Sequence, residues 1–116
     1  MNFIDQMLRN FNRHKAQTLK NMKQTIDIHT FTWFDKTYGN TYFAQEITLN
    51  YGTDQEKTYK NPFQYGYSSF EFKALEFLRE QGISIPEYRD ELKKKFIVRN
   101  YEQEVKKAFF KQNGLN

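Results

Sequence analysis

The stretch "TIDIHTFTWFDKTYGNTYFAQEITLN" (25–50) decides the fold, because residue types alternate along it on both sides of a turn signal. Its first part, 25–34, is rich in β-branched and aromatic residues, which favour strands. Gly39 and Asn40 are turn formers, and the alternation resumes over 41–50. We therefore expect two antiparallel strands joined by a tight turn.

A third strand is expected in "EKTYKNPF" (56–63), after a second turn at "YGTDQ" (51–55). Pro62 has no backbone N–H, so it should end this strand or place it at a sheet edge. The three segments predict an antiparallel β-meander. The rings of "TFTWF" (30–34) point to both sides of the first strand, so either both faces of the sheet are covered or one face is a binding surface.

A helix is expected before the sheet, over roughly residues 3–23. Apolar residues recur there at helical spacing, and Arg9 and Arg13 lie on the opposite side of the helix. Such a basic amphipathic helix packs on a core in most proteins. The alternative is a helix that binds a membrane surface or a partner.

Further helices are expected after the sheet. Ser68-x-x-Glu71 and Ser84-x-x-Glu87 match capping boxes, which start helices, and Gly82 is placed to end the first of the two. The segment "FIVRNY" (96–101) is compatible with the second helix or with a short strand.

These elements predict a single α+β domain over residues 1–116 in the order α-β-β-β-α-α. In this prediction a three-stranded antiparallel β-meander is packed by an N-terminal helix and one or two C-terminal helices. A chain of 116 residues can bury a core without disulfides or a metal.

The composition excludes several classes of protein. The chain has no cysteine, which excludes disulfides, thiolate metal sites and cysteine nucleophiles. No apolar run approaches the length of a membrane span, and "MNFIDQMLRNFNRHK" (1–15) lacks the apolar region of a signal peptide. We expect a cytoplasmic protein with no membrane partner.

Catalytic chemistry has little support in the sequence. The two histidines, His14 and His29, have no metal-ligand spacing around them, and no glycine-rich loop could hold phosphate. Asp27 and His29 share one face of a strand, as a base and its orienting acid would, although such a pair is more often merely solvated. We expect no catalytic residue, no metal, no cofactor and no enzymatic activity.

Charge and aromatic residues are unevenly distributed. The net charge is +4, residues 25–72 are mildly acidic, and both flanks are basic. Thirteen of the Phe, Tyr and Trp residues lie between Phe31 and Phe72. The densest basic run, lysines 93–95 followed by Arg99, is either a solvated helix surface or a phosphate-contacting patch.

Two sets of candidate binding residues follow. Exposed rings near the turns are candidates for binding a partner protein, because Tyr and Trp are enriched in interface hot spots. These are Trp33, Tyr38, Tyr42, Tyr65 and Tyr67. The candidates for binding nucleic acid or phosphate are Arg9, Arg13, Lys93, Lys94, Lys95 and Arg99.

Two strings, "WFDKTYGNTYF" (33–43) and "PFQYGY" (62–67), resemble strings in small, poorly characterised proteins of bacteriophages, prophages and other mobile elements. The resemblance covers roughly residues 26–80 and carries no established active site. It implies a phage accessory protein in the host bacterial cytoplasm. Such a protein would antagonise a defence system, as an anti-CRISPR does, by binding a host protein or nucleoprotein.

A second resemblance is topological. A meander followed by a helix is similar to the double-stranded RNA-binding domain, which implies direct RNA or DNA binding as the alternative function. In that family the helix start carries a lysine pair for phosphates. Here the helix start "SSFEFK" (68–73) has only Lys73, beside Glu71.

Overall fold

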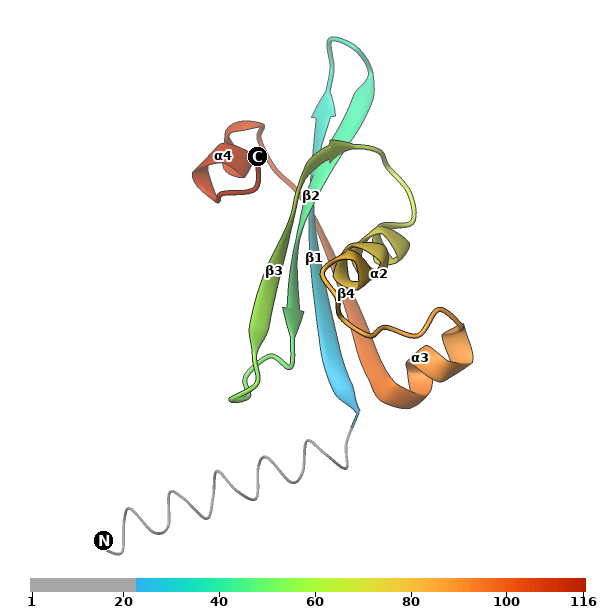
Figure 1. The fold of residues 1–116 in the computed structure, drawn as a ribbon. Helices are drawn as coiled ribbons and strands as arrows, with labels where there is room; N and C mark the ends of the chain where they lie inside the picture. Colours follow the sequence, from blue (N-terminus) through green and yellow to red (C-terminus); the bar gives the residue numbers. More distant parts are fainter. Residues whose placement is uncertain (1–22) are drawn as a thin grey trace, which may run out of the picture.

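The computed structural model describes residues 23–116, which form one four-stranded sheet with helices on both of its faces (Figure 1). Along the chain the elements are β1 (Gln24–Asp35), β2 (Asn40–Leu49), β3 (Lys57–Tyr65), α2 (Phe70–Glu80), α3 (Arg89–Lys95), β4 (Phe96–Glu104) and α4 (Ala108–Gln112). No helix of this part of the chain is long and apolar enough to cross a membrane. The helix predicted over 3–23, with Arg9 and Arg13, lies outside the described residues except for its last position.

The predicted hairpins are confirmed. β1 and β2 pair antiparallel from Ile26 with Leu49 to Asp35 with Asn40, and Gly39 takes a φ of +69° in the turn between them. β2 and β3 also pair antiparallel, with an irregularity in the register between Phe43 and Gln45. β3 is an edge strand, which explains how it tolerates a proline.

The prediction of a three-stranded antiparallel meander is wrong, because the sheet has a fourth strand. β4 lies beside β1 and runs parallel to it, so the strand order is β3-β2-β1-β4 in a mixed sheet. Parallel neighbours need a long crossover, and α2 and α3 lie in the connection between β3 and β4. Residues 96–101 are therefore strand, while the broad α+β class is confirmed.

Neither predicted capping box forms. α2 begins at Phe70 after Ser69, which has a left-handed φ of +54° and makes no side-chain capping bond. α3 begins only at Arg89, beyond the predicted box at Ser84. Arg79 explains why α3 starts later than predicted. Its guanidinium donates to the carbonyls of Ile85 (3.0 Å) and Pro86 (2.8 Å), and these bonds hold the loop after α2 against that helix.

One side of the sheet, the α2 face, carries the larger core. Even-numbered residues of β1 point to this side, and Ile26 and Ile28 are fully buried there. They pack with Ile47 and Leu49 of β2 and with the apolar stripe of α2, which consists of Ala74, Leu75 and Leu78.

A buried polar group fixes α2 on this face. Gln45 is fully buried and donates to the Thr30 hydroxyl (3.1 Å) and to the Phe70 carbonyl at the start of α2 (2.8 Å). Its carbonyl accepts a bond from the Asn61 amide (2.9 Å). A buried amide with all these partners is stabilising, whereas an unpaired one would be costly. Gln45 therefore ties β1, β3 and α2 to the same central strand.

The opposite side, the α4 face, is covered over only part of its area. Phe31 of β1 and Ala44 of β2 are buried there against Phe110 of α4 and Leu115 of the C-terminal tail. α2 and α4 thus lie on opposite sides of the sheet (Figure 1). The rings of residues 30–34 therefore differ in burial. Phe31 belongs to the core of the α4 face, whereas Phe34 is exposed.

Candidate functional site

Three of the five predicted partner-binding rings form a row across neighbouring strands. Trp33 pairs with Tyr42 in the β1–β2 register, and Tyr42 pairs with Tyr65 in the β2–β3 register. The ring centroids lie 5.7 Å apart in both pairs. Phe63 joins the row with its ring stacked on Tyr42 at 5.0 Å. Cross-strand pairing therefore gathers side chains that are up to 32 positions apart in the sequence.

The other two predicted rings stand at the same end of the sheet. Tyr38 lies in the β1–β2 turn and Tyr67 follows β3, where Gly66 N–H donates to the Thr41 carbonyl (3.0 Å). The exposed fractions are 77% for Tyr38, 68% for Tyr65 and 65% for Tyr67. Phe34, which was not among the predicted binding residues, is also 54% exposed here. We call this group the aromatic end: Trp33, Phe34, Tyr38, Tyr42, Tyr65 and Tyr67.

Gly66 explains why Tyr65 and Tyr67 point outward. Its φ of +143° is accessible mainly to glycine, and a Cβ at this position would lie 3.3 Å from the ring of Phe43. The chain can therefore close over the buried Phe43 only with glycine here. The tyrosines on either side are then left at the surface, Tyr67 edge-on to Phe70 at 5.5 Å.

Lysines of the C-terminal segment lie beside these rings. Lys107 Nζ is 5.3 Å from the ring centroid of Trp33, a cation–π distance. Lys107 and Lys111 also border an apolar hollow of about 510 Å³ between β3 and α4, lined further by Phe63, Ala108, Phe110 and Asn116. In the sequence the rings lie in an acidic part of the chain, and their proximity to these lysines could not be predicted, because it depends on where α4 docks.

The predicted basic residues do not form one patch. Lys93, Lys94 and Lys95 are exposed in the last turn of α3, where Lys94 Nζ lies 3.6 Å from Glu91. Arg99 is on β4 and belongs to the α4 face. Arg9 and Arg13 lie outside the described residues. The sequence run from Lys93 to Arg99 is therefore divided between a helix and a sheet face.

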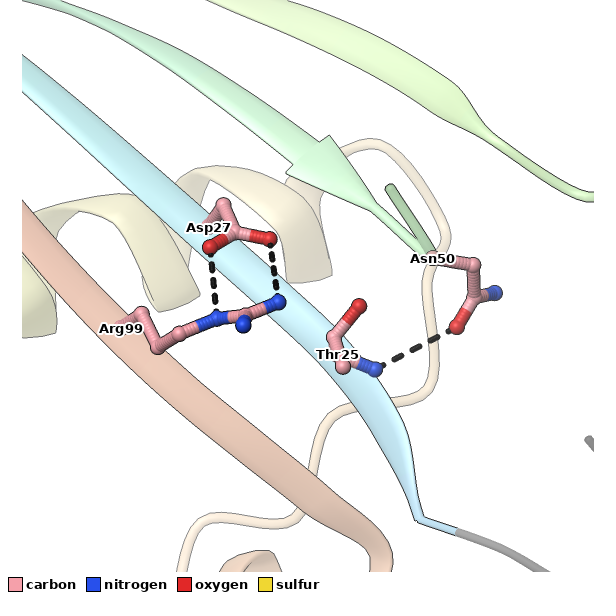
Figure 2. Close-up of polar contacts among 4 residues, drawn as sticks. All are labelled: Thr25, Asp27, Asn50 and Arg99. Atoms are coloured by element: carbon pink, nitrogen blue, oxygen red, sulfur yellow. Dashed lines mark hydrogen bonds and ion pairs between the residues drawn. The ribbon is translucent and has the colours of Figure 1, made fainter. Parts of the chain in front are cut away.

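Arg99 is held by a buried carboxylate. Its Nε lies 2.8 Å from Asp27 Oδ1 and its Nη2 lies 3.1 Å from Asp27 Oδ2, a two-pronged contact between β4 and β1 (Figure 2). The Asp27 side chain is only 8% exposed and that of Arg99 is 46% exposed. Nearby, Thr25 N–H donates to the Asn50 side chain (3.3 Å), which fixes the start of β1 against the end of β2 (Figure 2).

His29 lies next to this ion pair but is not oriented by it. Asp27 and His29 share a face of β1, as predicted, yet both carboxylate oxygens of Asp27 are engaged by Arg99. His29 stacks instead on Tyr101 of β4, with ring centroids 4.7 Å apart and an interplanar angle of 18°. Asp27 is therefore not placed as an orienting acid for His29.

Together these side chains line an open polar hollow of about 490 Å³ on the α4 face, at the end of the sheet away from the aromatic end. Its lining residues are Asp27, His29, Glu46, Thr48, Tyr51, Arg99 and Tyr101. Within residues 23–116, no three His, Asp or Glu side chains come together in a way that could hold a metal ion.

Comparison of the chain with protein-family models, with curated proteins and with solved structures gives no match.

Proposed function

We propose that this protein is a non-enzymatic binding protein that contacts a partner protein through the aromatic end. One observation carries the proposal: four of its rings, Phe34, Tyr38, Tyr65 and Tyr67, are each more than half exposed at a single end of the sheet. Phe34 points to the α2 face and Tyr65 to the α4 face, so these rings surround the end of the sheet. Large apolar side chains scattered singly need no explanation, but several gathered at one end are typical of a binding surface.

The type of ring favours a protein partner. Tyrosine and tryptophan bury much area with few rotatable bonds, and their polar atoms can hydrogen-bond at an interface rim. The row of Trp33, Tyr42 and Tyr65 stands on paired β-strands and is held by mutual ring contacts. Side chains fixed in this way lose little conformational entropy when a partner binds.

The non-enzymatic part of the proposal is supported by the polar hollow. A catalytic histidine needs a group that orients it and a path to substrate. Both carboxylate oxygens of Asp27, the acid nearest to His29 along β1, contact Arg99, and the His29 ring stacks on Tyr101. Glu46 lies opposite His29 in the β1–β2 register, and no hydrogen bond or ion pair joins the two side chains.

The concrete form of the proposal comes from the resemblance of residues 26–80 to phage and prophage proteins. In this form the protein acts in the host bacterial cytoplasm and antagonises a defence system, such as a CRISPR system, by occupying a host protein or nucleoprotein. Both strings that carry the resemblance contribute to the aromatic end: 33–43 supplies the β1–β2 turn and 62–67 the end of β3.

The proposal is tested by affinity capture with matched baits. The full chain and a Tyr38→Ala/Tyr65→Ala/Tyr67→Ala variant are used to capture proteins from a bacterial lysate. The control variant is Tyr51→Ala/Tyr88→Ala, which removes rings that are equally exposed but lie elsewhere on the surface. We expect one captured protein to be lost with the triple variant and retained with the control. Equal capture by both variants would contradict the proposal.

The defence-related form needs a separate measurement. Expression of the protein in cells with an active CRISPR system should restore plating of a targeted phage, and the triple variant should not restore it. Capture of a partner without any effect on plating would support the binding function but contradict the antagonism of a defence system.

Direct nucleic-acid binding is the alternative, and it predicts a different result. Anisotropy with single- and double-stranded RNA and DNA would show an affinity that falls steeply with salt and is lost when Lys93, Lys94 and Lys95 are replaced by alanine. We expect weak binding, because the charge of Arg99 is already compensated by Asp27.

A further inference from the structure

The two edges of the sheet differ in how they are protected. At the β3 edge, Phe63 N–H donates to the Leu115 carbonyl of the C-terminal tail (2.6 Å) and Lys60 Nζ donates to the Asn113 carbonyl (2.9 Å). Pro62 also removes one backbone donor from this strand. The β3 edge is thus partly covered by the chain itself, in the way that proteins commonly block edge strands.

At the β4 edge, α3 lies beside the start of the strand (Figure 1), but within residues 23–116 no backbone hydrogen bond from outside the sheet reaches residues 97–104. β4 is nine residues long, and β1 is its one partner in the sheet (Figure 1). All six residues from Arg99 to Glu104 are exposed. The backbone groups on the outer side of such a strand are a template for pairing with another strand.

We propose that β4 pairs antiparallel with β4 of a second copy of this chain, which joins two sheets into one. The charges along β4 favour this occupant. Lys93, Lys94 and Lys95 immediately precede the strand, and Glu102 and Glu104 lie at its end. In an antiparallel pair the basic start of each strand lies beside the acidic end of the other, whereas parallel pairing would bring like charges together.

The opposite charges also lie on the same side of the sheet. The side chain of Phe96 is buried in the α2-face core, so the even-numbered Glu102 and Glu104 point to that face as well. α3, which carries the lysines, packs on the same core through Leu92. An antiparallel pair related by a two-fold axis perpendicular to the sheet keeps both α2 faces on one side. The lysines of each copy can therefore approach the glutamates of the other.

The first test is the mass of the full chain in solution. Sedimentation velocity and light scattering, with protein concentrations up to about 1 mM, should show a reversible shift from 14.1 kDa to twice that mass. A monomer over the whole range would overturn the proposal.

Two charge-reversal variants identify the surface. Lys93→Glu/Lys94→Glu/Lys95→Glu and Glu102→Lys/Glu104→Lys should each weaken self-association by about tenfold or more, because each brings like charges together at both contacts. The control, Lys36→Glu/Lys73→Glu/Lys111→Glu, reverses three exposed lysines outside α3 and β4 and should self-associate like the unmodified chain.

Mixing the two variants is decisive. Each contact of the mixed dimer again joins opposite charges, so an equimolar mixture should dimerise at least as well as the unmodified chain. A misfolded variant could not give this rescue. If both variants and their mixture self-associate as the unmodified chain does, the dimer uses another surface and the proposal is wrong.

Hydrogen exchange distinguishes the other occupants of this edge. In the proposed dimer, the amides of residues 97–104 that point away from β1 become protected as the concentration rises, and the triple lysine variant loses this protection. Protection that is independent of concentration would assign the edge to a segment of the same chain, such as residues 1–22, and would overturn the proposal.

Discussion

The two halves of the α4 face are built from the same strands but differ in whether they are covered. Toward the aromatic end, Phe31 and Ala44 are buried beneath Phe110 of α4. Toward the other end, Asp27 and His29 lie in an open polar hollow. The alternation along β1 is unbroken between the halves, so it determines which side chains share a face but not which part of that face is covered.

The two halves also differ in what holds them. Apolar burial and ring contacts hold α4 to the sheet, whereas an ion pair and a ring stack connect β1 to β4 across the polar half. Burial of a large apolar side chain contributes more to stability than a partly exposed ion pair does. We therefore expect substitutions in the covered half to have the larger effects.

Phe110→Ala should have the largest effect. Phe110 is 2% exposed and contacts Phe63 with ring centroids 4.9 Å apart, so its loss leaves a cavity under α4. We expect the free energy of unfolding to fall by about 3 kcal/mol, the lower range for phenylalanine truncation in a core. Urea unfolding followed by the fluorescence of Trp33, the one tryptophan of the chain, measures this loss.

Phe72→Ala is the matched control, because Phe72 is more than half exposed on α2. Its substitution should change the free energy of unfolding by less than about 1 kcal/mol. Equal losses for the two variants would mean that the covered half is not held mainly by apolar burial.

Asp27→Ala should have the next largest effect, at about 1–2 kcal/mol. The carboxylate is buried, but Arg99 can turn its half-exposed guanidinium to solvent once its partner is gone, which limits the loss. A double-mutant cycle of Asp27→Ala with Arg99→Met isolates the pair energy by urea unfolding. A coupling near zero would show that the pair positions Arg99 without stabilising the fold.

The sequence predicted the paired strands well and the fourth strand poorly, for physical reasons. Residues 25–50 alternate around a glycine turn, and this pattern has few solutions other than a hairpin. β4 has few buried positions, so its alternation is weak, and the preceding lysines extend a helical pattern into it. Its pairing with β1 also joins residues about 72 positions apart, which no local pattern encodes.

For the candidate site, the exposure of three rings could be predicted from the sequence. Tyr38, Tyr65 and Tyr67 lie near turns, where exposure follows from local structure, and the structure leaves all three exposed. The partners of Arg99 and Trp33 could not be predicted, because Asp27 reaches Arg99 only through the parallel pairing and Lys107 reaches Trp33 only through the docking of α4.

Tyr101→Ala should have a smaller effect on the free energy of unfolding than Phe110→Ala or Asp27→Ala. It removes the ring stacked on His29, and a ring contact on an exposed strand contributes about 0.5 kcal/mol. The sensitive measurement is NMR, because the His29 ring protons should lose the ring-current shift that the Tyr101 ring imposes. Tyr101→Phe keeps the ring and should keep the shift. If His29 signals are the same in all three proteins, the stack does not persist in solution.

Lys107→Ala should have the smallest effect on stability, at most about 0.5 kcal/mol, because its ammonium lies over Trp33 in a partly solvated position. The substitution tests where the covered half of the α4 face ends and the aromatic end begins. The variant should alter Trp33 emission while leaving the urea midpoint almost unchanged, whereas Phe110→Ala alters both. Lys106→Ala, one residue earlier and also exposed, should alter neither. If Lys107→Ala lowered stability as much as Phe110→Ala, the cation would be part of the α4 core, and the aromatic end would begin beyond Trp33.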